Sequence, residues 1–212
     1  MSKPKNWPET LPYLTAPLHD KSLTPSHLSH LRAKPPAAPS SSLPVIPASA
    51  TPTPNPLVKI QPVRDPSHPA HGQHGLFAAR DLKPGTWITA YLGRVHTESA
   101  TDGTSDYDLW LDREAGLAVD AAGAGNEARF VNDYRGVRDQ GGPNAEFGTA
   151  WCERWGQLCV GFWVVRAAGK GKGKGKGGIR KGEEILVSYG KGFWDGRKGE
   201  EEQEEDGQSH HG

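Results

Sequence analysis

Three histidines that recur at every third position are the first residues whose chemistry could define a site. His68, His71 and His74 could ligate zinc, because imidazole is the commonest metal ligand among side chains. Zinc sites hold their ligands in a fixed geometry with supporting hydrogen bonds. The prolines and the glycine of residues 66–72 instead favour an irregular loop. We therefore expect no metal site here.

The two cysteines, Cys152 and Cys159, form neither a C-x-x-C pair nor a disulfide framework. So few cysteines fit a reducing compartment. The longest apolar run, around residues 158–165, is too short to span a bilayer. We expect an intracellular protein, in the nucleus or the cytoplasm.

Charge is balanced overall, with 25 Lys and Arg against 25 Asp and Glu, but both signs are concentrated in local runs. Lysine alternates with glycine in residues 169–178, and residues 200–206 are almost entirely acidic. Repeated cations on a flexible strand can contact nucleic-acid phosphates. Without interleaved aromatic residues such contact is weak and salt-sensitive, so a mobile, solvated insertion is the default interpretation.

Composition divides the chain into three regions. Residues 1–56 are rich in proline and small polar residues, so we expect them to be largely disordered. Apolar side chains such as Trp7 and Leu31 leave open a short helix that docks on the domain. Residues 57–195 have the composition of a folded domain, and residues 196–212 form an acidic tail that we expect to be disordered.

Short segments rich in β-branched and aromatic residues fill the central region, with Gly, Pro, Asp or Asn between them. This pattern predicts a compact, mostly antiparallel β-domain with little helix. The segments are residues 57–60, 76–79, 86–92, 107–111, 117–120, 145–151, 158–165 and 184–189.

A series of motif blocks runs through the same region. They are GLFAAR at residues 75–80, LKPG at 82–85, YLG at 91–93, residues 107–112 and 119–121, GNEARFVN at 125–132, Pro143-Asn144, and GEEILVSYG at 182–190. Any one block alone would mean little. In this order and spacing, the chain resembles the SET-domain protein lysine methyltransferases.

The resemblance implies a compact SET-type β-fold in which a knot-like crossing brings the segment of Asn132 beside the strand of Tyr189. It implies methyl transfer from S-adenosylmethionine to a protein lysine, with no metal. The cofactor would sit on one face, and the lysine would enter a narrow channel from the other. Catalysis of this kind depends mainly on alignment and on exclusion of water.

The resemblance also implies roles for particular residues. Tyr189 would be catalytic, with its hydroxyl aimed at the transfer site, and Gly75 would let backbone approach the cofactor. Phe147, where some family members have a tyrosine, would permit more than one methylation. The remaining assignments are cofactor contacts for His74, Gly75, Leu76, Arg129, Phe130, Asn132, Asp133 and Trp194, and channel walls for Tyr91, Tyr107 and Phe147.

The sequence departs from the family in three places, and the first is that Gln73 and His74 precede Gly75 where the family has a G-x-G. The usual Asn-His-Ser-Cys run reads Asn132-Asp133-Tyr134-Arg135, and two cysteines cannot build the family's flanking zinc segments. Trp194 is then the best candidate to close the cofactor pocket. The departure at Asp133 motivates an alternative, a catalytically silent SET-like module that binds a protein or peptide. For the enzyme, we expect a monomer whose partner is a protein substrate, histone or non-histone, with an accessible lysine.

Overall fold

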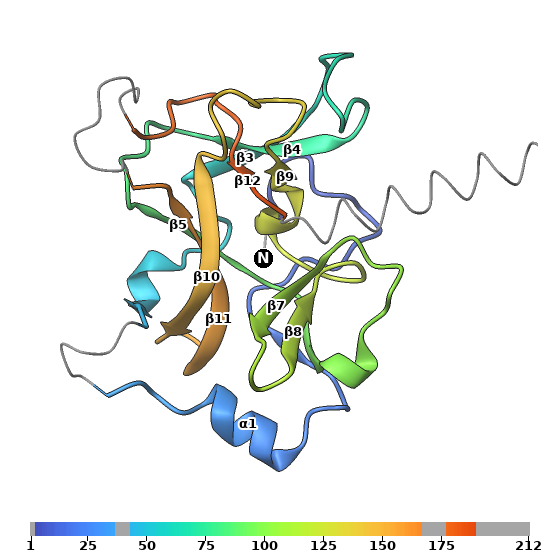
Figure 1. The fold of residues 1–212 in the computed structure, drawn as a ribbon, viewed down its shortest axis with the longest axis vertical. Coiled ribbons are helices and arrows are strands. Elements are labelled where there is room, and N and C mark those ends of the chain that lie inside the picture. The colour runs from blue at the N-terminus through green and yellow to red at the C-terminus, as the bar shows by residue number, and fades with distance from the viewer. Residues whose placement is uncertain (1–2, 37–42, 167–176, 190–212) are drawn as a thin grey trace, which may run out of the picture.

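The computed structural model describes residues 3–36, 43–166 and 177–189. Trp194, the acidic tail and most of the Gly/Lys-rich insertion lie outside these residues. Within them, short strands in small sheets dominate, and α1 (Pro25–Leu31) is the single α-helix (Figure 1). The predicted mostly β-fold with little helix is confirmed.

Two four-stranded sheets form the body of the molecule. The first has the order β1-β6-β8-β7 and the second the order β2-β10-β11-β5. Their strands are β1 (Leu18–His19), β6 (Arg94–Thr97), β8 (Leu117–Asp120) and β7 (Asp108–Asp112), then β2 (Val45–Ile46), β10 (Ala145–Cys152), β11 (Gln157–Val164) and β5 (Trp87–Tyr91). Most pairs are antiparallel, and the two short strands β1 and β2 join in parallel at the edges.

Two further strand pairs complete the architecture. The antiparallel pair joins β3 (Val58–Pro62) to β4 (His74–Ala78), and the parallel pair joins β9 (Asn132–Asp133) to β12 (Leu186–Val187). Three 3₁₀ turns connect the described strands: η1 (Ala48–Ala50), η2 (Glu98–Ala100) and η3 (Glu127–Phe130). The β9–β12 pair brings together the two segments that the predicted crossing required.

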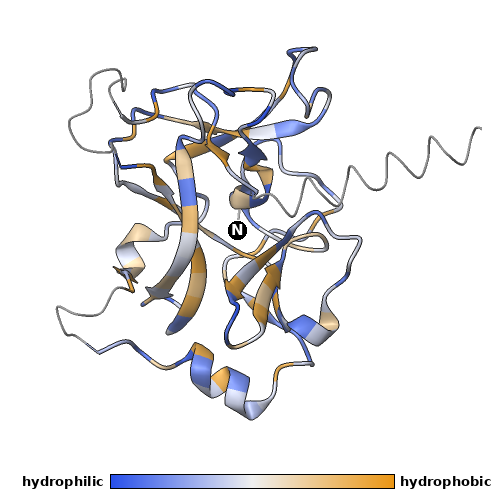
Figure 2. Ribbon diagram, in the orientation of Figure 1, coloured by the Kyte–Doolittle hydropathy of each residue, from blue (hydrophilic) through white to orange (hydrophobic). Residues whose placement is uncertain are grey.

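One hydrophobic cluster packs between these sheets and stabilises their arrangement. Leu76, Ile88, Phe162 and Ile185 are fully or almost fully buried in it. Figure 2 shows hydrophobic residues alternating with hydrophilic ones along β7 and β10, the period expected of strands with one face on a core. Among the described residues, no helix has the length and apolar character needed to cross a membrane.

The N-terminal region differs from the prediction. Over residues 3–36 and 43–56 the chain is packed on the domain rather than largely disordered. The indole of Trp7 lies edge-on to the rings of Tyr13 and Phe130, at centroid distances of 5.0 and 5.7 Å. Leu31, at the end of α1, is fully buried. A few large apolar side chains bury enough surface to offset the ordering of this proline-rich segment.

Candidate functional site

The parallel pairing of β9 with β12 brings the two most specific motif blocks into contact. Leu186 lies opposite Asn132, and Val187 lies opposite Asp133. Tyr189 follows directly, and its backbone N–H donates to Asp133 Oδ2 over 2.7 Å. Two of the residues predicted to hold the cofactor, Asn132 and Asp133, are therefore neighbours of the predicted catalytic tyrosine in space.

Two cavities flank this junction. The larger, of about 1000 Å³, is lined by aromatic rings that include Tyr91, Tyr107, Phe147 and Phe162. The smaller, of about 280 Å³, is lined by polar and aromatic residues, among them His74, Phe130, Asn132 and Asp133. Four residues line both cavities: Asp106, Tyr107, Arg129 and Tyr189. Tyr189 thus lies where the two cavities adjoin.

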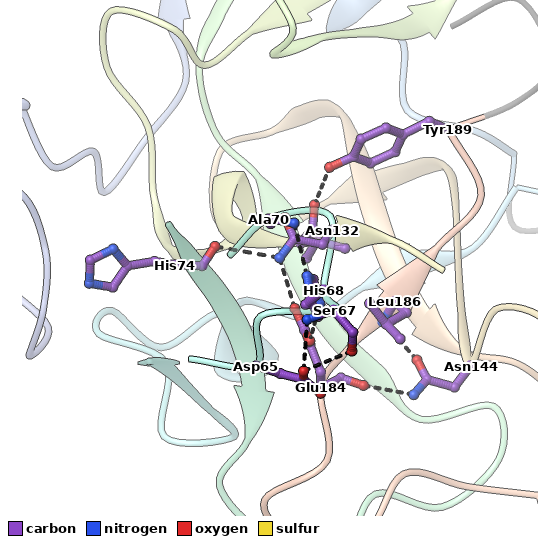
Figure 3. Close-up of polar contacts among 11 residues, drawn as sticks. Asp65, Ser67, His68, Ala70, His74, Asn132, Asn144, Glu184, Leu186 and Tyr189 are labelled. Atoms are coloured by element: carbon purple, nitrogen blue, oxygen red, sulfur yellow. Dashed lines mark hydrogen bonds and ion pairs between the residues drawn. The ribbon is translucent and has the colours of Figure 1, made fainter. Parts of the chain in front are cut away.

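The hydroxyl of Tyr189 is held at this boundary by one short hydrogen bond. It donates to the carbonyl oxygen of Val131 over 2.6 Å (Figure 3). Because its single proton is engaged there, the phenolic oxygen can meet a further group only as an acceptor. An acceptor oxygen at this point suits an amine or a positively polarised methyl group.

Arg129 places a permanent positive charge beside the same boundary. Its guanidinium carbon lies 4.1 Å from the centroid of the Tyr107 ring, and its Nε donates to Ala121 O over 3.1 Å. Stacking and hydrogen bonding together hold this cation in place. The guanidinium of Arg129 therefore provides a fixed positive charge at the boundary of the two cavities.

Tyr91 contributes a ring to the larger cavity rather than a reactive hydroxyl. The hydroxyl donates to Tyr107 O over 2.7 Å. Burial, reinforced by the neighbouring hydroxyl of Tyr189, raises the pKa of Tyr91 well above its usual value. Tyr91 accordingly stays neutral and serves as an apolar wall.

Comparisons with solved structures find partial likenesses. A chain of the Chaetomium thermophilum polycomb repressive complex 2 is 23% identical, with 63% of this chain and 15% of that chain covered and a TM-score of 0.46. A chain of that complex in an autoinhibited conformation bound to S-adenosylmethionine is 22% identical, with 64% and 15% covered and a TM-score of 0.46. A chain of an active polycomb repressive complex 2 in the basal state is 22% identical, with 63% of this chain and 15% of that chain covered and a TM-score of 0.47.

This chain therefore spans 15% of the length of each of those chains. No protein-family model matches the sequence, and no curated protein matches it.

Asp133, the residue at which the sequence departs from the motif it resembles, supports the backbone where β9 and β12 meet. Its side chain is 5% exposed. It accepts hydrogen bonds from the backbone N–H groups of Arg135 and Tyr189, at 2.9 and 2.7 Å, and from the Arg135 guanidinium. The carboxylate thereby ties β9 to the segment that carries Tyr189. Asp133 also lines the smaller cavity.

Asn132 belongs to a polar network behind the smaller cavity. Its Nδ2 donates to Glu184 Oε1 over 2.8 Å, and Glu184 Oε2 accepts from His68 Nε2 over 3.0 Å (Figure 3). Asn144, of the Pro-Asn motif, clamps the same strand by donating to Glu184 O and accepting from the backbone N–H of Leu186. The motif asparagines thus fix the strand that leads to Tyr189.

Two of the predicted cofactor contacts are not among the residues that line either cavity. Leu76 is fully buried, and neither it nor Gly75 is among the residues that line the smaller cavity. A Cβ built at Gly75 would collide with the carboxylate of Glu184. The structure therefore gives a different reason for this glycine: its missing side chain makes room for Glu184. Gly75 affects the site by leaving room for Glu184, and Leu76 affects it by packing in the hydrophobic core.

Sequence reasoning missed three residues of this site. Asp106 lines both cavities, and His68 and Glu184 form a buried hydrogen-bonded pair behind the smaller one. Glu184 stands inside the G-E-E motif, which could have indicated it. Both ring nitrogens of His68 are engaged, one by Glu184 and the other by Ala70. Among the described residues, no cluster of three or more His, Cys, Asp or Glu side chains could hold a metal.

The N-terminal region builds part of the larger cavity. His30, Ala33 and Leu43 line it. His30 Nε2 lies 2.8 Å from Asp112 Oδ2, which joins the end of α1 to the end of β7. A segment outside the predicted domain therefore shapes the space expected to receive the substrate.

Proposed function

We propose that this protein transfers methyl groups from S-adenosylmethionine to the ε-amine of a protein lysine. The observation that carries the proposal is the junction of the two cavities at Tyr189, the residue that the motif resemblance assigns to catalysis. The smaller cavity would hold the cofactor, and the larger would hold the substrate chain. An in-line displacement needs its two reactants to meet at one point, and two cavities that adjoin at Tyr189 are consistent with this requirement.

The residues of the smaller cavity fit the cofactor. When bound, S-adenosylmethionine supplies an electrophilic methyl group on a positively charged sulfur. Phe130 and His74 present rings, and Arg129 and Arg135 present cations suited to a carboxylate. The Nδ2 of Asn132 is engaged by Glu184, and within the described residues its Oδ1 accepts no hydrogen bond. That oxygen is therefore suited to an ammonium group.

The residues of the larger cavity fit a lysine side chain. The rings of Tyr91, Tyr107 and Phe147 can pack against its alkyl stem and face its cationic head. Phe147 packs against Phe162 at a centroid distance of 5.8 Å. Because phenylalanine has no hydroxyl to hold a water beside the amine, this wall leaves room for a methylated nitrogen.

Activating the lysine requires removal of its proton. A free lysine has a pKa of about 10.4, so forming the neutral amine near pH 7.4 costs roughly 4 kcal/mol. The cation of Arg129 and the removal of the amine from water inside the cavity both disfavour the ammonium form and lower this cost. The carboxylate of Asp106, which also lines both cavities, instead favours the ammonium form and so favours entry of the charged lysine side chain.

The proposal is tested by two measurements on the full chain. Calorimetry should detect binding of S-adenosylmethionine and competition by S-adenosylhomocysteine; no heat at millimolar ligand would overturn the cofactor assignment. Labelled cofactor with a cell extract should then mark protein lysines. A silent binding module would bind protein or peptide but show no methyl transfer in a single turnover.

A further inference from the structure

The loop between β3 and β4 forms one wall of the smaller cavity. Its two ends are joined by hydrogen bonds between Val63 and Gln73 and between Gly72 and Val63, of 2.9 and 3.1 Å. Within it, His68, Pro69, Ala70 and Gln73 line the cavity. The position of this loop therefore sets the shape of the cofactor site.

His68 ties this wall to the opposite side of the site. Its side chain is 7% exposed and that of Glu184 is 9% exposed, so the contact between them is shielded from water. Glu184 precedes β12, and its second oxygen holds Asn132, the first residue of β9. As Figure 3 shows, His68, Glu184 and Asn132 form one chain of hydrogen bonds across three segments.

The protons in this chain are fixed by its geometry. The backbone N–H of Ala70 donates to His68 Nδ1 over 3.0 Å, so that nitrogen carries no proton. His68 is then the neutral tautomer that donates from Nε2 to Glu184 Oε2. Glu184 accepts from both neighbours, and its charge prevents the Asn132 amide from flipping, because a flip would set two oxygens against each other.

We propose that His68 is a positioning residue for the cofactor. Through Glu184 it holds the amide of Asn132 with its oxygen available to the cofactor. This inference rests on the proposed function and adds to it a residue that no motif includes. It predicts an effect on cofactor affinity and not on the chemical step.

Calorimetry and steady-state kinetics on full-length variants test the proposal. His68→Phe keeps a ring but removes both hydrogen bonds, so it should raise the Kd for S-adenosylmethionine 10- to 100-fold and leave kcat at saturating cofactor within threefold. His68→Gln can still donate to Glu184 and should recover most of the affinity. His71→Phe is the matched control, since His71 is an exposed histidine of the same loop that lines neither cavity. It should leave the Kd unchanged.

A double variant separates positioning from general destabilisation. If His68 acts through Asn132, His68→Phe combined with Asn132→Ala should bind the cofactor less than threefold more weakly than Asn132→Ala alone. Independent losses would multiply and would overturn the proposal. A large fall in kcat with unchanged Kd in His68→Phe would overturn it as well.

Nuclear magnetic resonance of the free protein gives a readout independent of activity. The imidazole ¹⁵N shifts of His68 should report the Nε2–H tautomer, and the amide of Ala70 should exchange at least tenfold faster in His68→Phe than in the wild type. If the wild type failed to bind the cofactor, the proposed function would be wrong. These spectra would still test the clamp, by which we mean the hydrogen bonds of His68 to Ala70 and Glu184. Rapid Ala70 exchange in the wild type would show that no clamp exists.

Discussion

At the scale of single residues, Tyr189 is held more firmly than a solvated strand tyrosine would be. Its N–H is bound by Asp133 and its O–H by the carbonyl of Val131. These bonds use the donors of Tyr189 and direct the lone pairs of its oxygen to any group that arrives at the boundary of the two cavities. Preorganisation of this kind accelerates a reaction when the interaction strengthens in the transition state.

Tyr189→Phe should therefore abolish most turnover while leaving the fold and much of the cofactor affinity intact. The ring is retained, so packing changes little. The loss of one positioned polar group in comparable sites costs about 2.7 to 4 kcal/mol, roughly a 100- to 1000-fold fall in rate. Turnover and cofactor affinity measured side by side check this expectation.

Tyr134→Phe is the matched control for that substitution. Tyr134 lies beside Arg135, whose guanidinium carbon is 4.9 Å from its ring centroid, and lines neither cavity. It should change turnover threefold or less. A fully active Tyr189→Phe protein would mean that the transfer site lies elsewhere.

Phe147 should decide how many methyl groups are added. Wild type should yield di- or trimethyllysine, because the larger cavity offers no hydroxyl at this position to crowd a methylated amine. Phe147→Tyr should shift the product towards monomethyllysine. Mass spectrometry of a modified peptide checks both, and monomethyl product alone from both proteins would contradict the assignment.

At the scale of elements, α1 is held on the domain by the buried side chain of Leu31 and by the contact of His30 with Asp112, two residues that line the larger cavity. Partial burial acts to raise the pKa of Asp112, but the hydrogen bonds from His30 and from the backbone N–H groups of Ala115 and Glu114 outweigh it and hold the pKa below its usual value. The carboxylate form of Asp112 therefore stabilises the folded state above the ordinary aspartate pKa of about 3.9. That stability is lost as the pH falls through the lowered value.

Asp112→Asn tests this contact. It removes the charge but keeps an oxygen for the backbone N–H groups, so the free energy of unfolding at pH 7 should fall by about 0.5–1 kcal/mol. The difference from wild type should shrink as the pH is lowered from 7 towards 3. Urea unfolding at several pH values measures it, and a difference independent of pH would contradict the assignment.

At the scale of the whole molecule, the Gly/Lys-rich insertion enters the fold at a defined point. Leu82 and Ile179 exchange backbone hydrogen bonds of 2.7 and 2.9 Å, so the segment after residue 178 is part of the sheet framework. The lysines of the insertion precede this bridge and lie outside the described residues. Their role stays a prediction from composition.

Replacing Lys170, Lys172, Lys174 and Lys176 with serine should leave the melting temperature and the methylation of short peptides unchanged. The substitution keeps the length and the glycines of the insertion. If the lysines contact nucleic acid or an acidic partner, activity on a large substrate should fall at low salt and converge with wild type at high salt. A large loss of melting temperature would show that the insertion is part of the packed structure.

Local patterns in the sequence determined the class of fold and the candidates for the site. Short β-rich segments between turn residues predicted the mostly β-architecture, because strand period and turn chemistry are properties of a few consecutive residues. The order of motif blocks singled out Asn132 and Tyr189, which the structure brings together. The sequence alone could not assign the packing of Trp7 and Leu31, because the composition of a proline-rich segment does not indicate which surface that segment packs against.

Only the tertiary structure decided which residues support the site. Glu184 meets Asn132 from 52 positions away and His68 from 116 positions away, and no periodicity connects residues so distant. The same contact bears on Gly75, because a Cβ there would collide with the carboxylate of Glu184, which lies far along the chain, as well as meet the ring of Phe77. Hydrogen bonds between remote segments depend on which strands the fold brings side by side, and that arrangement exists only once the core has been packed.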